Sequence, residues 1–193
     1  MSEPPQSSGE HQRADRKGYL PRLSPEHYRA HAIVHWTLTI EHRATGWLTD
    51  HFHHMWRETL LHTCARYNLL CPAYVLMPDH IHVLLIGLNP KGSDQRVGIE
   101  FLRKALRPAL APATWQKQVH DHVLREAERE HGAFQTIAHY IWANPVRAGL
   151  CQAAADYPYA GCCVPGYPEL NGHADDYWMR FWRLHRHLVE KFQ

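Results

Sequence analysis

The chain has 193 residues, of which 45% are hydrophobic and 21% charged, and its formal net charge is +2 with the histidines neutral. This length suffices for one domain with a substantial core and is too short for two large ones. The small net charge is only a weak sign of an anionic partner. No apolar run resembles a transmembrane helix or a secretory signal, so we expect a cytoplasmic protein with no membrane partner.

The numbers and spacing of the cysteines and histidines limit which disulfide or metal sites the chain can form. The five cysteines are odd in number and none stands in a C-x-x-C pair. This argues against a disulfide framework and against a zinc ribbon, and it is typical of a reducing compartment. The 18 histidines are unusual, and several lie in runs. A single pair of histidines therefore needs further support before it is taken as a set of metal ligands.

The first half of the chain predicts a leader, a strand and a helix. Residues 1–25 are polar and charged, and we interpret them as a disordered leader. Residues 31–41 alternate in polarity with period two, which predicts a strand with one buried face. Thr49 or Asp50 is expected to cap a helix. The apolar positions of that helix recur at helical spacing: Phe52, Met55, Trp56, Leu60 and Leu61.

The next stretch predicts a hairpin with two histidines on its second strand. A strand over residues 72–76 leads through Met77-Pro78-Asp79, a tight connection, into residues 80–86. Side chains alternate along a strand, so His80 and His82 point to the same face. Their strand is otherwise apolar on both faces, which predicts a central strand covered on both sides.

Two further segments follow. Apolar residues from Val97 onward predict a helix that ends at Pro108, and its basic residues include Arg103 and Lys104, a nonspecific surface for phosphate. Residues 115–125 contain a second His-x-His with a charged residue in its middle, and they are interpreted as an edge strand or a loop.

The last third predicts two helices. In a helix that starts near Ala133, Tyr140 and Asn144 lie one turn apart at the border of an apolar stripe. A residue before proline is biased out of helical geometry, so Asn144 is expected to end this helix and to cap a short second one over residues 145–148, which Gly149 would stop. Residues 151–168 are rich in turn formers. Aromatic and basic residues from Tyr177 onward predict a C-terminal helix that suits either nucleic acid or docking on the domain.

These residues together suggest phosphodiester chemistry. His80 and His82 with the Asn144 amide would form a set of nitrogen and oxygen ligands with open positions, which suits Mg²⁺ or Mn²⁺. Tyr140 could then attack a phosphodiester and form a phosphotyrosine that conserves the bond energy. Each residue also has a purely structural explanation. A histidine pair in a histidine-rich chain, a border tyrosine and a capping asparagine are all common, so position alone does not decide.

Two motifs resemble those of a known family. Residues 74–82 (Tyr-Val-Leu-Met-Pro-Asp-His-Ile-His) and residues 140–150 (Tyr-Ile-Trp-Ala-Asn-Pro-Val-Arg-Ala-Gly-Leu) closely resemble the REP-associated tyrosine transposases, chromosomal relatives of the single-tyrosine HUH transposases. Trp115-Gln116 and His120-Asp121-His122 are similar to the middle segment of that family, in the same order. The resemblance spans roughly residues 30–160. Both motifs in order, with Asn-Pro after the tyrosine, make it specific.

The resemblance implies an α+β fold, a ferredoxin-like antiparallel sheet with helices packed on it. Residues 30–160 would form the transposase-like domain, and residues 161–193 a turn-rich segment and a C-terminal helix. His80 and His82 would hold the metal with Asn144 as third ligand, and Tyr140 would be the nucleophile. Arg103, Lys104 and Arg147 are candidate DNA contacts.

The implied substrate is single-stranded DNA with hairpin (REP-like) repeats, nicked and rejoined through a 5′-phosphotyrosine intermediate. The implied protein is a monomer or homodimer, nucleoid-associated when bound to DNA. Many relatives have asparagine where this chain has Asp79. Its carboxylate could tune the metal or serve as a turn residue only, and we favour the second interpretation.

Two alternatives stay open. One is a domesticated hairpin-binding protein with little catalysis. The other is a zinc hydrolase that uses His80, His82 and either His120 or His122.

Overall fold

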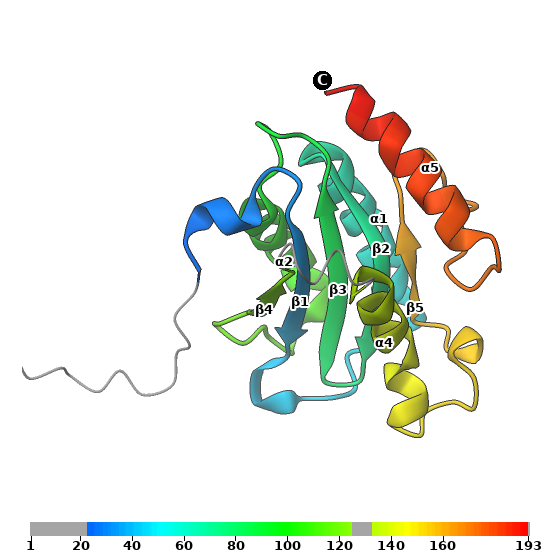
Figure 1. Ribbon diagram of the computed structural model, residues 1–193. Coiled ribbons are helices and arrows are strands. Elements are labelled where there is room, and N and C mark those ends of the chain that lie inside the picture. Colours follow the sequence, from blue (N-terminus) through cyan, green and yellow to red (C-terminus); the bar gives the residue numbers. More distant parts are fainter. Residues whose placement is uncertain (1–22, 125–132, 193) are drawn as a thin grey trace, which may run out of the picture.

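The computed structural model describes residues 23–124 and 133–192. The predicted leader therefore lies almost wholly outside the described residues. The chain folds into strands and α-helices joined by short 3-10 helices (Figure 1). In chain order these are η1 (Pro25–Tyr28), β1 (Ile33–Thr39), η2 (Glu41–Arg43), α1 (Asp50–Arg66), β2 (Leu69–Met77), β3 (His80–Gly87), α2 (Gln95–Leu110), β4 (His120–Val123), α4 (Ala133–Arg147), η3 (Ala154–Asp156), β5 (Ala160–Cys163) and α5 (Tyr177–Glu190).

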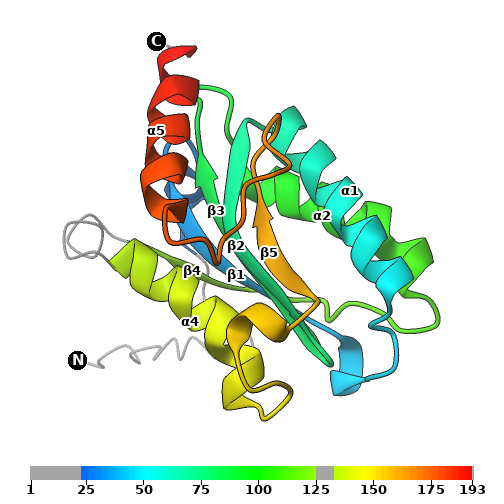
Figure 2. The ribbon, with the colours of Figure 1, turned by 90° about the vertical axis from the view of Figure 1, so that its right-hand side faces the viewer.

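The strands form one five-stranded antiparallel sheet in the order β4-β1-β3-β2-β5. The first four strands and the helices α1 and α2 give the β-α-β-β-α-β arrangement of a ferredoxin-like fold, as the resemblance implied. β3 lies in the middle of the sheet, which confirms the prediction of a central strand. α1 and α2 cover one face of the sheet, and α4 and α5 cover the other (Figure 2).

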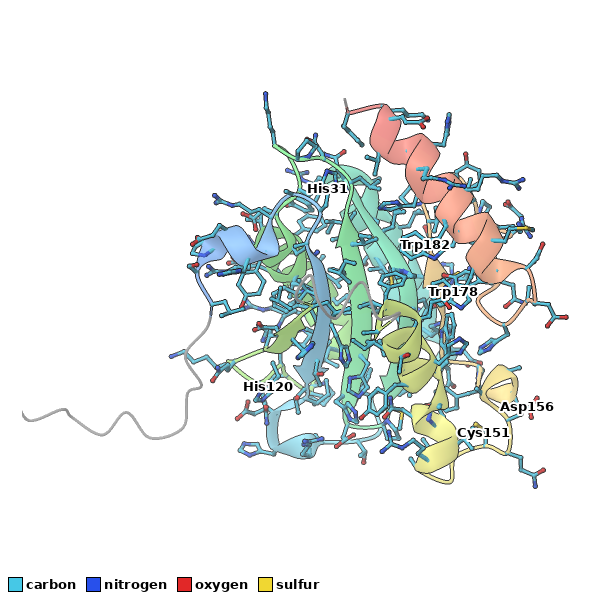
Figure 3. The ribbon with its side chains drawn as sticks, in the orientation of Figure 1. His31, His120, Cys151, Asp156, Trp178 and Trp182 are labelled. Carbon is cyan, nitrogen blue, oxygen red and sulfur yellow. The ribbon has the colours of Figure 1, made fainter. Side chains whose placement is uncertain are left out.

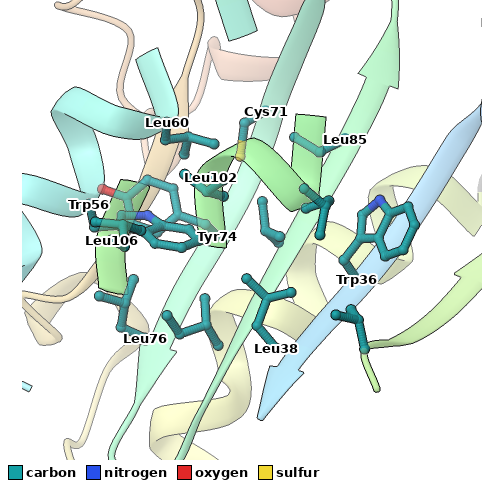
Figure 4. Close-up of a cluster of buried hydrophobic side chains, with 14 of the residues drawn as sticks. Trp36, Leu38, Trp56, Leu60, Cys71, Tyr74, Leu76, Leu85, Leu102 and Leu106 are labelled. Carbon is teal, nitrogen blue, oxygen red and sulfur yellow. The ribbon is translucent and has the colours of Figure 1, made fainter. Parts of the chain in front are cut away.

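Each face of the sheet has its own hydrophobic core. The core under α1 and α2 is built from large side chains, several of which Figure 4 shows: Trp36, Trp56, Tyr74, Leu85, Leu102 and Leu106. The core under α4 and α5 includes Phe134, Ile141 and Phe181. A fully buried side chain of this size contributes roughly 1.5–3 kcal/mol. Because both faces are covered, β2 and β3 are apolar on both sides.

The predicted hairpin is confirmed. Met77 pairs with His80, so Pro78 and Asp79 form a two-residue connection. The Asp79 carbonyl accepts a hydrogen bond from the Ile40 amide at 3.0 Å, which ties this turn to the end of β1. The hairpin therefore places His80 at the start of the central strand, beside β1.

The predicted helix after residue 49 is also confirmed. The Thr49 hydroxyl caps α1 by accepting a hydrogen bond from the Phe52 amide at 3.1 Å. Leu61 was expected on the buried face, but its side chain is 39% exposed on the outer side of α1.

Other expectations about element bounds were wrong. α2 continues past Pro108 to Leu110, and α4 continues through Pro145 to Arg147. The segment predicted to be rich in turns contains β5, which adds an edge strand beside β2. Its sequence, Ala-Gly-Cys-Cys, lacks the β-branched and alternating residues that mark a strand.

The C-terminal helix forms as predicted and packs on the domain. Trp178 and Trp182 lie on the side of α5 that faces the rest of the molecule (Figure 3), where both rings contact Phe134 of α4 at centroid distances of 5.5 and 4.9 Å. The aromatic residues of α5 thus build the second core. Within the described residues, no helix combines the length and the apolar character needed to cross a bilayer.

Candidate active site

His80 and His82 lie on the face of the sheet that α4 covers. The two Nε2 atoms are 3.1 Å apart, and the rings are nearly perpendicular, at 88°. His80 is partly exposed at the strand end, whereas His82 is only 8% exposed. The prediction that alternation along the strand places His80 and His82 on the same face is thus confirmed. Each imidazole turns its Nε2 atom toward the other.

The other nitrogen of His82 faces β1. Its Nδ1 atom lies 3.1 Å from Thr37 Oγ1 and 3.1 Å from His35 Nε2. Thr37 is the direct cross-strand partner of His82, and His35 stands on the same face two residues earlier. Sequence reasoning missed both residues. The sequence shows that one face of β1 is more polar than the other. It does not show that β1 pairs with β3 and so brings this face beside His82.

Asp79 contacts the outer nitrogen of His80. Asp79 Oδ1 is 2.6 Å from His80 Nδ1, and Asp79 Oδ2 accepts a hydrogen bond from Arg43 Nη1 at 2.9 Å. Burial alone would raise the pKa of Asp79, but the hydrogen bonds from His80 and Arg43 outweigh it and hold this pKa below its ordinary value. The interpretation of Asp79 as a turn residue only was therefore wrong, since its carboxylate orients His80.

Burial also keeps two of the histidines neutral. Loss of hydration and, to a lesser degree, the neighbouring His35 and His80 lower the pKa of His82 to about 3. Loss of hydration likewise lowers the pKa of His35 to about 4, with a smaller effect from His122. Near neutral pH both rings are therefore uncharged, which is the state in which an imidazole nitrogen can bind a metal ion.

Tyr140 projects from α4 over these histidines. Its ring centroid lies 6.3 Å from that of His82 and 6.4 Å from that of His35, both in edge-to-face geometry. The side chain is 43% exposed, so a substrate can reach its hydroxyl. The guanidinium carbon of Arg147, nearly two turns later on the same helix, stands 4.8 Å from the Tyr140 ring centroid. The structure thus brings Tyr140, His82 and Arg147 together.

Asn144 lies one turn after Tyr140 and stabilises the end of α4. Its Nδ2 atom donates to the Tyr140 carbonyl at 2.8 Å and to the Ile141 carbonyl at 3.3 Å. In a regular helix the amide of residue 145 would donate to the Ile141 carbonyl, but Pro145 has no N–H. The Asn144 side chain replaces that donor. This explains why the helix does not end at Asn144, and Oδ1 takes no part in these two hydrogen bonds.

α4 ends at Arg147, and Gly149 closes it two residues later. Gly149 has a positive φ of 70°, its amide donates to the Val146 carbonyl, and the Leu150 amide donates to the Pro145 carbonyl at 2.8 Å. These bonds form a Schellman motif, which favours glycine at this position. The expected stop at Gly149 is thus confirmed, although it ends one continuous helix.

The remaining candidates lie elsewhere. Arg103 and Lys104 belong to α2 on the opposite face of the sheet. His120 and His122 pair with Thr37 and His35, so the whole of β1 separates them from His82, by about 10 Å at the usual strand spacing. Across residues 23–124 and 133–192, no three His, Cys, Asp or Glu side chains are grouped so that they could hold a metal ion. The zinc hydrolase alternative therefore has no support.

Comparisons with known proteins agree with the motifs. No protein-family model matches the chain. The chain is 24% identical over 143 residues to a protein of Haemophilus influenzae named "Putative REP-associated tyrosine transposase", and the match covers 66% of this chain and 78% of that relative.

Solved structures share the fold. The structure of a REP-associated tyrosine transposase bound to a REP hairpin superposes with a TM-score of 0.61 at 19% identity, over 74% of this chain and 81% of that one. A transposase structure from Deinococcus radiodurans R1 overlaps more loosely, with a TM-score of 0.41 at 18% identity, over 58% of this chain and 92% of that one, and adds no weight. The resemblance inferred from the two motifs is confirmed, and so is the fold that it implied.

Proposed function

We propose that this chain nicks and rejoins single-stranded DNA beside hairpin repeats, with Tyr140 as the nucleophile and a divalent metal ion at His80 and His82. The observation that carries the proposal is the contact of Tyr140 with His82, which joins two motifs some sixty residues apart in the sequence. Neither motif supports this chemistry alone. A tyrosine beside two converging imidazole nitrogens does.

The donor set fits Mg²⁺ or Mn²⁺. Ionised Asp79 can only accept, so His80 donates from Nδ1 and turns the lone pair of Nε2 toward His82. When His82 donates from Nδ1 to Thr37, its Nε2 also presents a lone pair. With both lone pairs turned inward, the two Nε2 atoms, 3.1 Å apart, can share one cation, and without it a proton on either nitrogen makes the same contact a hydrogen bond. This separation matches two adjacent nitrogen ligands each about 2.1 Å from one ion, and Asn144 Oδ1 would be the third donor.

When bound, such an ion withdraws electrons from the scissile phosphate and orients it. The Tyr140 oxygen attacks phosphorus and loses its proton. The bond from phosphorus to the 3′ oxygen breaks, and that oxygen takes up a proton as a free 3′-hydroxyl. A 3′-hydroxyl then attacks the 5′-phosphotyrosine, which releases Tyr140 and restores a phosphodiester. Arg147, beside the Tyr140 ring, is placed to contact phosphate oxygens.

The substrate is inferred from the site and from the relatives. The exposed Tyr140 side chain suits an unpaired strand that can approach the sheet. The solved neighbour is described as bound to a REP hairpin, which supports a hairpin next to that strand. Tyr140 and the two histidines belong to one chain and already lie together, so we propose that a monomer contains the complete site.

The test is a covalent adduct that survives denaturation. Wild-type protein with Mn²⁺ should retain a 3′-labelled hairpin strand and release a 5′-labelled fragment with a free 3′-hydroxyl. Tyr140→Phe should abolish the adduct and leave DNA binding within about twofold, because the hydroxyl is the only group removed. His80→Ala, His82→Ala or added EDTA should each reduce the adduct by at least about a hundredfold, the lower end of what such catalysis contributes.

Tyr67→Phe, a tyrosine that packs on Phe101 beside α2, is the matched control and should form the adduct normally. An adduct that persists in Tyr140→Phe would refute the assignment of the nucleophile. Hairpin binding without any adduct across Mg²⁺ and Mn²⁺ titrations would favour the alternative function, a hairpin-binding protein with little catalysis.

A further inference from the structure

A groove of about 660 Å³ runs along α2, on the face of the sheet opposite to Tyr140. We call it the α2 groove. Six basic side chains line it, from the residue that follows η1, from α2 and from the segment before β4: Arg29, Arg96, Arg103, Lys104, Arg107 and Lys117. The sequence predicted a nonspecific phosphate surface on the α2 helix, but Arg29 and Lys117 join it only in the fold.

Little negative charge offsets these cations. The groove contains two carboxylates, Asp94 and Glu100. Asp94 pairs with Arg29 at 3.0 Å and also caps α2 by accepting hydrogen bonds from the Arg96 and Val97 amides. The charge of Asp94 is therefore balanced by Arg29 and by the N-terminus of α2, which leaves Glu100 as the other carboxylate that lines the groove.

Three cations are available to a ligand. Arg103 is held by a hydrogen bond to the Gln116 carbonyl. Lys104, Arg107 and Lys117 are exposed, and no carboxylate among residues 23–124 and 133–192 forms an ion pair with them. Arg96 and Arg107 are eleven residues apart, so the basic face of α2 extends over about 16 Å. This is the arrangement expected for contact with several phosphates in a row.

The floor of the groove offers no surface on which a base could stack. Trp36 is 1% exposed, and its indole N–H donates to Gln95 Oε1 at 3.0 Å. Ile99 and Val119 beside it are each 3% exposed. Proteins that bind unpaired strands use exposed aromatic rings as stacking platforms. A cationic groove without such rings suits a backbone whose bases are already paired.

We propose that the α2 groove holds the phosphate backbone of a paired DNA stem, while the unpaired strand passes around the β4 edge to Tyr140. The inference rests on the proposed function, because it takes the hairpin beside the nick as its ligand. Lys117 and Val119 immediately precede β4, the edge strand, so the groove opens at the side of the sheet around which the strand would pass.

The test compares two triple charge reversals with the same change in net charge. One is Lys104→Glu/Arg107→Glu/Lys117→Glu in the α2 groove. The matched control is Arg183→Glu/Arg186→Glu/Lys191→Glu, three exposed positions at the C-terminal helix. Fluorescence anisotropy over a salt series measures binding of a labelled DNA hairpin with a single-stranded 5′ extension, and of the extension alone. Circular dichroism checks that both variants are folded.

Relative to the control, the groove variant should bind the hairpin at least about tenfold more weakly at low salt. Its slope of log affinity against log salt should become shallower by about 0.9 for each phosphate that the groove no longer neutralises. Binding of the extension alone should match the control, and hairpins with different stem sequences should respond alike, because interactions with the phosphate backbone carry no sequence information.

Equal hairpin affinity in the groove variant and the control would overturn the proposal. An equal decrease in affinity for the hairpin and for the extension alone would overturn it too, and would assign the groove to single strands. Formation of the covalent adduct shows whether only the assignment of the groove fails or the proposed function fails as well. Groove variants should still form the Tyr140 adduct with the extension at saturating concentration, whereas Tyr140→Phe should bind the hairpin and form none.

Discussion

At the scale of single residues, the histidine pair is held from both sides. Asp79 fixes His80 through Nδ1, and Arg43 in turn holds the second oxygen of Asp79. On the other side, Thr37 and His35 contact Nδ1 of His82. Such partners set the tautomer and the orientation of a metal-binding imidazole, and they contribute to affinity without touching the ion. The proposed site thus depends on residues outside the recognisable motifs.

Replacement of Asp79 tests this support. Asp79→Ala should weaken Mn²⁺ binding by about 10- to 100-fold, because His80 loses the acceptor that orients it. Asp79→Asn should retain most of the affinity, since an amide oxygen can still accept from His80 Nδ1. Isothermal titration with Mn²⁺ measures both. Glu190→Gln at the end of α5 is the control, and an unchanged affinity in Asp79→Ala would show that His80 needs no such partner.

At the scale of an element, α4 is extended by the side chain of its own asparagine. The Pro145 ring leaves the Ile141 carbonyl without its regular donor, and Asn144 Nδ2 supplies one at 3.3 Å. The helix therefore continues to Arg147, and Gly149 closes it two residues later. This continuation matters for the site, because it sets Arg147 over the ring of Tyr140.

A double-mutant cycle tests the replacement of the missing donor. Asn144→Ala alone should lower the free energy of unfolding by about 0.5–1.5 kcal/mol, the usual contribution of one such hydrogen bond. In the Pro145→Ala background the same change should cost less, because the introduced alanine donates its own amide to the Ile141 carbonyl. Urea unfolding of the four proteins gives the coupling. Equal costs in both backgrounds would mean that Asn144 does not substitute for the donor that the proline lacks.

At the scale of the whole molecule, the sheet separates two surfaces with different chemistry. The α4 face carries Tyr140 and the buried histidines, and the α2 face carries the basic groove. Each face also buries at least one neutral histidine. His53 of α1 contacts the Tyr74 hydroxyl at 3.0 Å, and burial, aided by Arg57, lowers its pKa to about 4. His35 and His82 lie on the other face.

These histidines predict a loss of stability in acid. A histidine with a depressed folded pKa stabilises the fold above its ordinary pKa of about 6.5, and this contribution is lost as the pH falls toward the folded value. The free energy of unfolding should therefore fall between pH 6.5 and 4, by up to about 1.4 kcal/mol per pH unit for each histidine. His53→Gln should reduce the slope, measured by urea unfolding at several pH values. His51→Gln on the same helix is the control, and equal slopes in both variants would contradict the role of His53.

Elements that depend on local interactions can be predicted from the residues alone. Period-two polarity predicts β1, the Pro78-Asp79 turn predicts the hairpin, and alternation along a strand places His80 and His82 on one face. A capping threonine and helical spacing predict α1. These patterns depend on a few neighbouring residues, so they can be interpreted without the fold.

Contacts between distant segments, by comparison, arise only when the chain folds. Strand pairing sets His35 and Thr37 against His82, the packing of α4 on the sheet sets Tyr140 over that histidine within one chain, and the fold gathers Arg29 and Lys117 beside α2. β5 is a strand because β2 offers an edge, although its own residues do not favour one. Such contacts depend on the register and docking of whole elements, which no local periodicity encodes.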